Sequence, residues 1–146
     1  MSARILTILV ALVPLPAWAQ TGQADVTAAL VAQGFVIALL EGDLPTAASL
    51  AAPPFSFDGA VAPDAGALRA ELERLVSSGR FRGRRVLRVQ TFSAQDAVRR
   101  FGEPPGRVRD LAGRRDLVAL VRLNRGGVVL FLRKVATFWR VVGVTD

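Results

Sequence analysis

The C-terminal end of the chain most constrains what it can fold into. Three runs rich in β-branched and aromatic residues, 116–123, 128–135 and 138–144, are separated by short turns at 124–127 and 136–137. Runs and turns of these lengths predict three antiparallel strands joined as a meander.

Both turns are short enough to predict the strand register, with Leu123 opposite Val128 and Lys134 opposite Trp139. One face is then apolar except for Lys134 at its edge, and it carries Leu117, Ala119, Val121, Leu123, Val128, Leu130, Leu132, Trp139 and Val141. The other face mixes apolar residues with arginines, and it carries Val118, Leu120, Arg122, Val129, Phe131, Arg133, Phe138, Arg140 and Val142. A sheet with one apolar face needs a layer of helices over that face.

The N-terminal half supplies the helices. An apolar helical stripe over 26–40 follows Asp25, the expected N-cap, and stops at Gly42. A second helix is expected over 44–52, capped by Asp43 and broken by Pro53-Pro54.

The middle of the chain alternates between short extended and helical pieces. Residues 55–58 and 60–61 are expected to be extended about Gly59, and a third helix to run from Pro63-Asp64 to Ser78-Gly79. Residues 84–92 predict a strand with Leu87, Val89 and Thr91 on one side, 93–101 a short helix, and 107–115 a polar connector with a short extended piece. The fold class is therefore α+β.

The first nineteen residues have the pattern of a secretory signal peptide. Arg4 precedes the apolar run 5–13, and Ala17-Trp-Ala19 is a small-residue cleavage site. The alternative, a membrane anchor, would need a longer apolar run without prolines. We therefore expect cleavage after Ala19, a periplasmic or secreted location, and a single domain over residues 20–146.

The chain is strongly basic, with a formal net charge of +7 that lies mainly in its second half. Arginine-rich chains can bind nucleic acid through its phosphates. Here aromatic residues do not alternate with the arginines, and the chain is expected to be exported. The sequence therefore predicts a solvated basic surface, with no nucleic-acid partner and no membrane association after signal cleavage.

The order of elements resembles the nuclear transport factor 2-like superfamily, which includes SnoaL-like cyclases and ketosteroid isomerases. The motifs that carry the resemblance are Val36-Ile-Ala-Leu-Leu-Glu-Gly-Asp43, Phe55-Ser-Phe-Asp-Gly59, Ala67-Leu-Arg-Ala-Glu-Leu72 and Phe138-Trp-Arg-Val-Val-Gly-Val144. The resemblance implies a cone-shaped half-barrel in which three N-terminal helices pack on a curved antiparallel sheet. It further implies a pocket inside the cone and dimerisation through the convex sheet face.

The chain contains no histidine, cysteine or tyrosine. This removes the usual proton shuttle near neutral pH, a thiol nucleophile and a phenolic donor. Its carboxylates do not have the spacing of metal ligands, so neither a metal site nor a cofactor is expected. The composition favours a non-catalytic protein.

Two residues could nevertheless belong to a ligand site. Asp58 has a position similar to that of the general base in ketosteroid isomerases, provided that burial raises its pKa; its alternative role is to stabilise the turn at Gly59. Trp139 would either stack on a ligand or pack in the core with one hydrogen-bond partner for its indole.

Arg133 and Arg140 are predicted to lie opposite one another on the mixed face, and like charges so placed are destabilising. Acidic groups of another chain or exposure to water would resolve this. Apolar residues beside them, including Phe131 and Phe138, would form a patch large for a monomer to expose, with Arg122 at its far end. We therefore expect a homodimer through this face.

These observations favour a small exported module that binds a ligand or dimerises without catalysing a reaction. The expected ligand is small and either apolar or anionic. The alternative is a small isomerase, dehydratase or cyclase that uses Asp58 as general base and arginine as electrostatic stabiliser.

Overall fold

The computed structural model describes residues 25–111, 113 and 115–146. The predicted signal peptide lies outside these residues. In chain order the elements are α1 (Val26–Glu41), α2 (Leu44–Leu50), β1 (Ala51–Phe57), β2 (Ala60–Ala62), α3 (Ala65–Ser77), β3 (Val86–Ser93), α4 (Ala94–Phe101), the 3₁₀ helix η2 (Gly106–Leu111), β4 (Leu117–Leu123), β5 (Gly127–Val135) and β6 (Phe138–Thr145).

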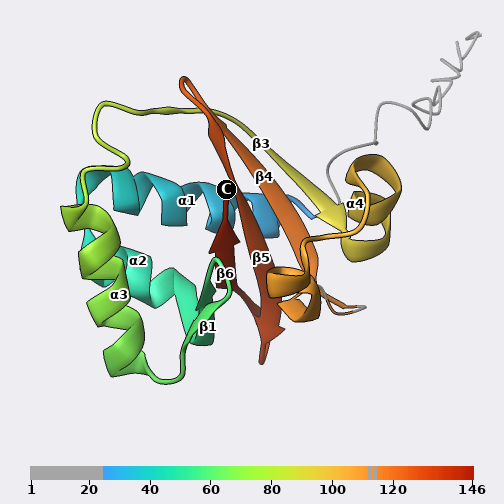
Figure 1. The fold of residues 1–146 in the computed structure, drawn as a ribbon, viewed down its shortest axis with the longest axis horizontal. Helices are drawn as coiled ribbons and strands as arrows, with labels where there is room; N and C mark the ends of the chain where they lie inside the picture. The colour runs from blue at the N-terminus through green and yellow to red at the C-terminus, as the bar shows by residue number, and fades with distance from the viewer. Residues whose placement is uncertain (1–24, 112, 114) are drawn as a thin grey trace, which may run out of the picture.

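The six strands form one curved sheet in the order β2-β1-β6-β5-β4-β3. Helices α1, α2 and α3 cover one face, which we call the core face (Figure 1). Helix α4 and η2 lie over the other, which we call the second face (Figure 1). The α+β fold class is confirmed. The expectation of a wholly antiparallel sheet is wrong at one place, because β1 pairs with β6 in parallel.

Four helices begin at residues whose side chains accept a hydrogen bond from the backbone N–H three positions later. The pairs are Asp25 with Ala28, Asp43 with Thr46, Asp64 with Ala67, and Ser93 with Asp96. Each cap satisfies a backbone donor that has no partner within its helix. The predicted starts of these helices are therefore confirmed.

The meander forms as predicted, with a different register in its first turn. Leu132 lies opposite Val141 and Lys134 opposite Trp139, as expected. Val128 pairs with Val121 rather than with Leu123. The N–H of Leu123 donates to the carbonyl of Gly126, so the turn is tighter than predicted. The resulting shift is two residues, which leaves every side chain on its predicted face.

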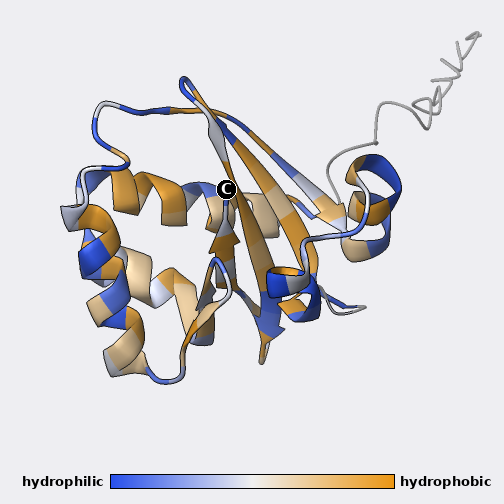
Figure 2. Cartoon of the chain, in the orientation of Figure 1, coloured by the Kyte–Doolittle hydropathy of each residue, from blue (hydrophilic) through white to orange (hydrophobic). Residues whose placement is uncertain are grey.

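The core face carries the main hydrophobic core. All nine apolar residues predicted for this face are buried in one cluster with residues of α1, α2 and α3. Phe35 of α1, Phe55 of β1 and Leu72 of α3 are among its largest fully buried side chains. Figure 2 shows apolar residues along the central strands, with hydrophilic residues on the outer side of α3 and in the loops. The interior of the predicted cone is thus filled by side chains.

The segment after α2 differs from the prediction. Helix α2 ends at Leu50 rather than at residue 52, and β1 runs through Pro53-Pro54. Proline cannot donate to a ladder, but the register of β1 with β6 is interrupted between Ala51 and Ser56, where both prolines lie. Pairing with β6 was a long-range contact that the local sequence did not reveal.

Strand β3 and the connector before β4 also depart from expectation. The register of β3 with β4 shifts between Val86 and Arg88, so Leu87 is exposed while Thr91 is buried. The predicted extended piece within 107–115 is wrong, because the chain forms η2 there. In the part of the chain that the structure describes, none of the helices has the length and apolar character needed to cross a membrane.

Candidate functional site

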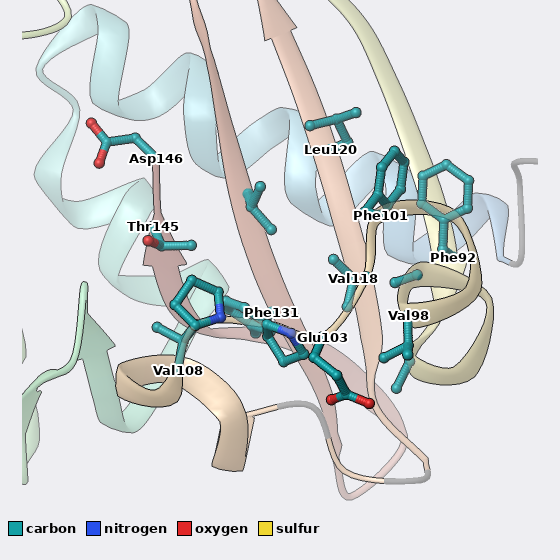
Figure 3. A pocket seen from close by; sticks show the side chains of 16 residues that line it. Phe92, Val98, Phe101, Glu103, Val108, Val118, Leu120, Phe131, Thr145 and Asp146 are labelled. Atoms are coloured by element: carbon teal, nitrogen blue, oxygen red, sulfur yellow. The ribbon is translucent and has the colours of Figure 1, made fainter.

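The second face of the sheet holds a cavity of about 320 Å³. Strands β3, β4, β5 and β6 form its floor, and α4 and the segment through η2 form its walls. The residues that line it are Phe92, Ala94, Ala97, Val98, Phe101, Gly102, Glu103, Pro104, Pro105, Val108, Val118, Leu120, Val129, Phe131, Thr145 and Asp146. Phe92 and Phe101 lie at one end and Thr145 and Asp146 at the other (Figure 3). The lining is apolar except near the second end and at Glu103.

Helix α4 presents a regular apolar stripe to this cavity. Ala94, Ala97, Val98 and Phe101 recur at the spacing of one helix face, and all four line the cavity. The ring of Phe101 meets that of Phe92 edge to face, with centroids 5.4 Å apart at 81°. Such aromatic pairs hold both rings in a defined orientation. This wall is therefore built by an ordinary amphipathic helix.

The opposite wall, η2, lies close to the sheet because two glycines leave room for it. A Cβ on Gly143 of β6 would lie 2.7 Å from Cδ1 of Leu111, and one on Gly59 would lie 3.0 Å from Cβ of Arg107. Val108 of η2 is buried in a small cluster with Val118, Phe131 and Val142. Larger residues at Gly59 and Gly143 would push η2 outward.

A polar contact ties η2 to the β1–β2 turn. The carboxylate Oδ1 of Asp58 accepts hydrogen bonds from the hydroxyl of Thr145 at 2.6 Å and from Nε of Arg107 at 2.7 Å. The Thr145 hydrogen bond, followed by the Arg107 guanidinium, lowers the pKa of Asp58 below its ordinary value. Asp58 itself has a left-handed backbone, φ 52°, at the turn before Gly59. The contact therefore fixes the turn and one wall of the cavity together.

Asp58 does not meet the conditions set for a general base. Its side chain is about half exposed, and its pKa is lowered rather than raised. It lines a second, smaller hollow of about 160 Å³ at the end of the core face, beside Arg80 and Phe81. That volume is below the usual range of ligand pockets, about 300–1,000 Å³. The geometry of Asp58 fits the turn-stabilising role.

Trp139 belongs to the core face and does not line the cavity. Its ring is buried within the main core cluster, and its indole N–H donates to Oδ2 of Asp25 at 3.2 Å. The ammonium of Lys134 lies 5.4 Å from the ring centroid. Asp25 thus joins the start of α1 to β6, because the same carboxylate caps the helix.

Arg133 and Arg140 lie opposite one another as predicted, but an acid of the same chain resolves their repulsion. Asp116 is 5% exposed and accepts hydrogen bonds from Nη2 of Arg133 at 2.9 Å and from Nε at 3.1 Å. These bonds raise the pKa of Arg133. Arg140 instead stacks on Phe138, with its guanidinium carbon 5.3 Å from the ring centroid. No second chain is needed to satisfy the pair.

The predicted exposed patch on the second face is largely covered by the chain itself. Phe131 is 3% exposed because η2 packs over it, and Val142 is buried with it. Phe138, by contrast, is 62% exposed, and Arg122 lies exposed at the far end of the face. The premise of a large exposed apolar patch is therefore wrong. The homodimer inferred from it remains a prediction.

Within the described ranges, no three acidic side chains are grouped so that they could hold a metal ion. The same part of the chain contains no buried side-chain nitrogen or oxygen that lacks a hydrogen-bond partner. Among the described residues that line the cavity, no buried side-chain nitrogen or oxygen is therefore left unpaired.

Sequence reasoning missed the cavity because it treated 107–115 as a polar connector. A signal was present in that stretch. Val108 and Leu111 are apolar residues three positions apart among polar ones, which is typical of a single helical turn packed on a surface. Together with the stripe on α4, this spacing predicts that a second layer covers the mixed face.

No family model matches this chain, and neither does any curated protein. A solved structure of a protein of unknown function with a cystatin-like fold, from Nostoc punctiforme, is similar to it. The two are 13% identical, with a TM-score of 0.47, and the match covers 79% of this chain and 83% of that one. This likeness assigns neither a family nor a function to the chain.

Proposed function

We propose that this protein is a non-catalytic module that binds a small apolar ligand on the second face of its sheet. The observation that carries the proposal is the cavity of about 320 Å³ with its apolar lining. A space of this size is near the lower limit of ligand pockets, about 300–1,000 Å³. It suits a compact molecule of up to about three rings, or a short acyl chain, better than a larger one.

Three features of the cavity support binding rather than simple packing. Its floor is a sheet, its α4 wall is rigidly joined to β3 through the cap at Ser93, and its η2 wall is tied down by Asp58 and Arg107. A site whose walls are held before the ligand arrives loses less entropy on binding. Phe101, at the α4 end, is exposed and can cover a bound ligand.

A catalytic function has less support. The cavity lining includes Glu103, Thr145 and Asp146 as its polar side chains, and the Thr145 hydroxyl is already engaged with Asp58. Among the described lining residues, Thr145 is the one side chain that can donate a hydrogen bond. The isomerase, dehydratase or cyclase alternative therefore lacks the constellation that it requires.

Export, family membership and assembly belong to the same proposal. The signal-like segment 1–19 supports a periplasmic or secreted protein. The order of two helices, a strand pair, a third helix and then the remaining strands of a curved sheet supports membership of the nuclear transport factor 2-like superfamily. A homodimer through the second face would use exposed Phe138 and Arg122 rather than buried Phe131. Light scattering of protein beginning at Gln20 tests the homodimer. A protein that stays monomeric at tens of micromolar would contradict the homodimer.

The binding experiment titrates the same protein with N-phenyl-1-naphthylamine, a neutral apolar dye whose fluorescence rises when it leaves water. A neutral probe avoids attraction to the basic surface. We expect saturable enhancement at one site. The variant Ala97→Leu adds three carbons in the cavity and should weaken binding at least about tenfold.

The matched control is Gln95→Leu, which introduces the same side chain at an exposed position of the same helix outside the cavity lining. It should bind the dye as the wild type does. Absence of saturable binding by the wild type would overturn the proposal. Equal binding by the Ala97→Leu variant and the wild type would place the dye elsewhere and would also overturn it.

A further inference from the structure

The structure gathers five arginines at one end of the sheet, where β3 begins and β4 turns into β5. They are Arg84, Arg85, Arg88, Arg122 and Arg125, which we call the basic end. Figure 1 shows the β4–β5 turn beside the chain entering β3, and Figure 2 shows hydrophilic residues at this tip. The five residues come from two segments of the chain, so the sequence alone did not group them.

Backbone contacts hold the two segments together. The N–H of Arg85 donates to Oδ1 of Asn124 at 3.0 Å, and the N–H of Asn124 donates to the carbonyl of Arg85 at 3.1 Å. Arg88 lies opposite Arg122 in the ladder of β3 and β4. Arg88 and Arg122 are therefore held opposite one another on a fixed backbone frame, although like charges repel.

The side chains of Arg84 and Arg125 cross between the two segments. A Cβ on Gly83 would lie 3.3 Å from Nη2 of Arg125, and a Cβ on Gly126 would lie 3.7 Å from Nη1 of Arg84. Both glycines have positive φ, which turns the chain tightly at each place. The guanidinium group of one arginine in each segment thus lies beside a glycine of the other segment.

None of the five arginines forms an ion pair with a carboxylate of the described residues. This differs from Arg74, Arg80, Arg99, Arg107 and Arg133, each of which has an acidic partner. The acidic members of these ion pairs, Glu71, Asp146, Asp96, Asp58 and Asp116, lie outside the basic end. The basic end keeps a positive field that an external anion can neutralise.

Exposed aliphatic side chains lie directly beside this charge. Val26 and Leu30 of α1 and Leu87 of β3 are each more than half exposed. They line a shallow hollow of about 240 Å³ together with Arg88. Leu87 points outward because of the register shift next to it in β3. Arginines flanked by exposed aliphatic residues are the combination found on surfaces that bind anionic bilayers.

We infer that the basic end and its aliphatic neighbours dock the protein on a lipid bilayer that carries anionic headgroups. The arginines face the headgroup phosphates, and Val26, Leu30 and Leu87 enter the interface. This inference departs from the sequence-based expectation of no membrane association, which stays a prediction. It goes beyond the proposed ligand cavity and does not depend on it.

Nucleic acid is the competing polyanion, and the surroundings of the arginines favour the bilayer. Single strands are bound by stacking bases on aromatic residues among the cations. Here the neighbouring exposed residues are aliphatic, and Phe81, the aromatic residue near the start of this segment, is buried. Aliphatic side chains do not contribute to the binding of a phosphate backbone, whereas they stabilise contact with acyl chains.

The test is cosedimentation of protein beginning at Gln20, which contains every element of the fold, with vesicles. One set contains equal parts of phosphatidylglycerol and phosphatidylcholine, and the other contains phosphatidylcholine alone. We expect binding to the anionic vesicles at low salt and much weaker binding to the neutral ones. The double variant R88Q/R122Q should weaken partitioning about thirtyfold, because each arginine near the surface contributes about fivefold.

Two further variants separate charge from apolar insertion. The control R69Q/R109Q removes two exposed arginines elsewhere and should bind nearly as the wild type does. Leu30→Ser should weaken binding to anionic vesicles about tenfold, since Leu30 enters the interface. Circular dichroism confirms that each variant is folded.

Three results would overturn the inference. The first is no binding of the wild type to anionic vesicles at low salt. The second is an equal loss in R88Q/R122Q and R69Q/R109Q, which would reflect net charge alone. The third is a Leu30→Ser variant that binds like the wild type while duplex or single-stranded DNA binds more tightly than the vesicles. That outcome would assign the basic end to nucleic acid.

Discussion

The two faces of the central sheet are made from the same strands but have different roles. On the core face, alternate residues of β4, β5 and β6 pack against α1, α2 and α3 in one continuous cluster. On the second face, the intervening residues make a small cluster around Val108 and leave a cavity of about 320 Å³. The core face holds most of the buried apolar surface, and with it most of the fold's stability. The second face, with a thinner cover, has room for a ligand.

The difference also shows in how polar residues are used. On the core face, Asp25 caps α1 and accepts the indole N–H of Trp139. Asp58 holds the η2 wall of the second face through Arg107, and Asp116 neutralises Arg133 on that face. Each carboxylate connects segments that are far apart in the sequence. Breaking these connections should therefore affect one face at a time.

The largest expected effect is from Leu132→Ala. Leu132 is fully buried on the core face, opposite Val141. Removing its branched end leaves a cavity in a filled core and should lower the free energy of unfolding by about 2–5 kcal/mol. Chemical denaturation measures this. A loss below about 1 kcal/mol, which is typical of surface sites, would mean that the core face is not the main source of stability.

Asp116→Asn should have the next largest effect, about 1–3 kcal/mol. The amide can still accept from Gly113, but it no longer neutralises Arg133, which then faces Arg140. The cost is below that of a fully buried pair because Arg133 is partly exposed. A double-mutant cycle with Arg133→Gln isolates the pair. Strict additivity of the two single losses would show that the contact contributes nothing.

Asp25→Ala should lower the free energy of unfolding by about 1–2 kcal/mol, since it removes a helix cap and leaves the Trp139 indole without this acceptor. The fluorescence of Trp139 should change in the native state as well. Asp43→Ala removes a cap from the exposed start of α2 and is the control. An equal loss in the two variants would mean that the indole contact is without energetic consequence.

The smallest effect concerns the pH dependence of stability. The pKa of Asp58 is lowered in the fold, chiefly by the Thr145 hydrogen bond and then by Arg107. The unfolded chain therefore binds more protons near its ordinary pKa of 3.8, and this part of the stability is present above about pH 4. It is lost as the pH falls through the lowered value. The difference in stability between wild type and Asp58→Asn should shrink below about pH 4; a difference independent of pH would contradict the role assigned to this carboxylate.

Much of this architecture follows from local sequence. Period-two alternation in β4, β5 and β6 identified nine core-face residues and missed Val144, which lies beyond a register shift between β5 and β6. Asp25, Asp43 and Ser93 marked helix starts. These signals are local, because a strand face or a cap depends on residues a few positions apart.

The missed features depend on contacts between distant segments. The parallel pairing of β1 with β6, the packing of η2 on Gly143 and the pairing of Asp116 with Arg133 join residues whose local patterns do not name a partner. The cavity depends on the packing of η2, which forms one of its walls. Its position could therefore not be predicted from the meander alone, even though both faces of the meander were assigned correctly.

The most direct test of the difference between the faces is one substitution made on each. Ala119→Leu adds bulk to the filled core face, where Ala119 is fully buried, and Ala97→Leu adds the same atoms to the cavity. Overpacking should lower the free energy of unfolding of the Ala119→Leu variant by about 1–3 kcal/mol. The Ala97→Leu variant should be at least as stable as the wild type, because the added carbons occupy existing space. An equal loss of stability in both variants would contradict a cavity on the second face, and with it the central claim.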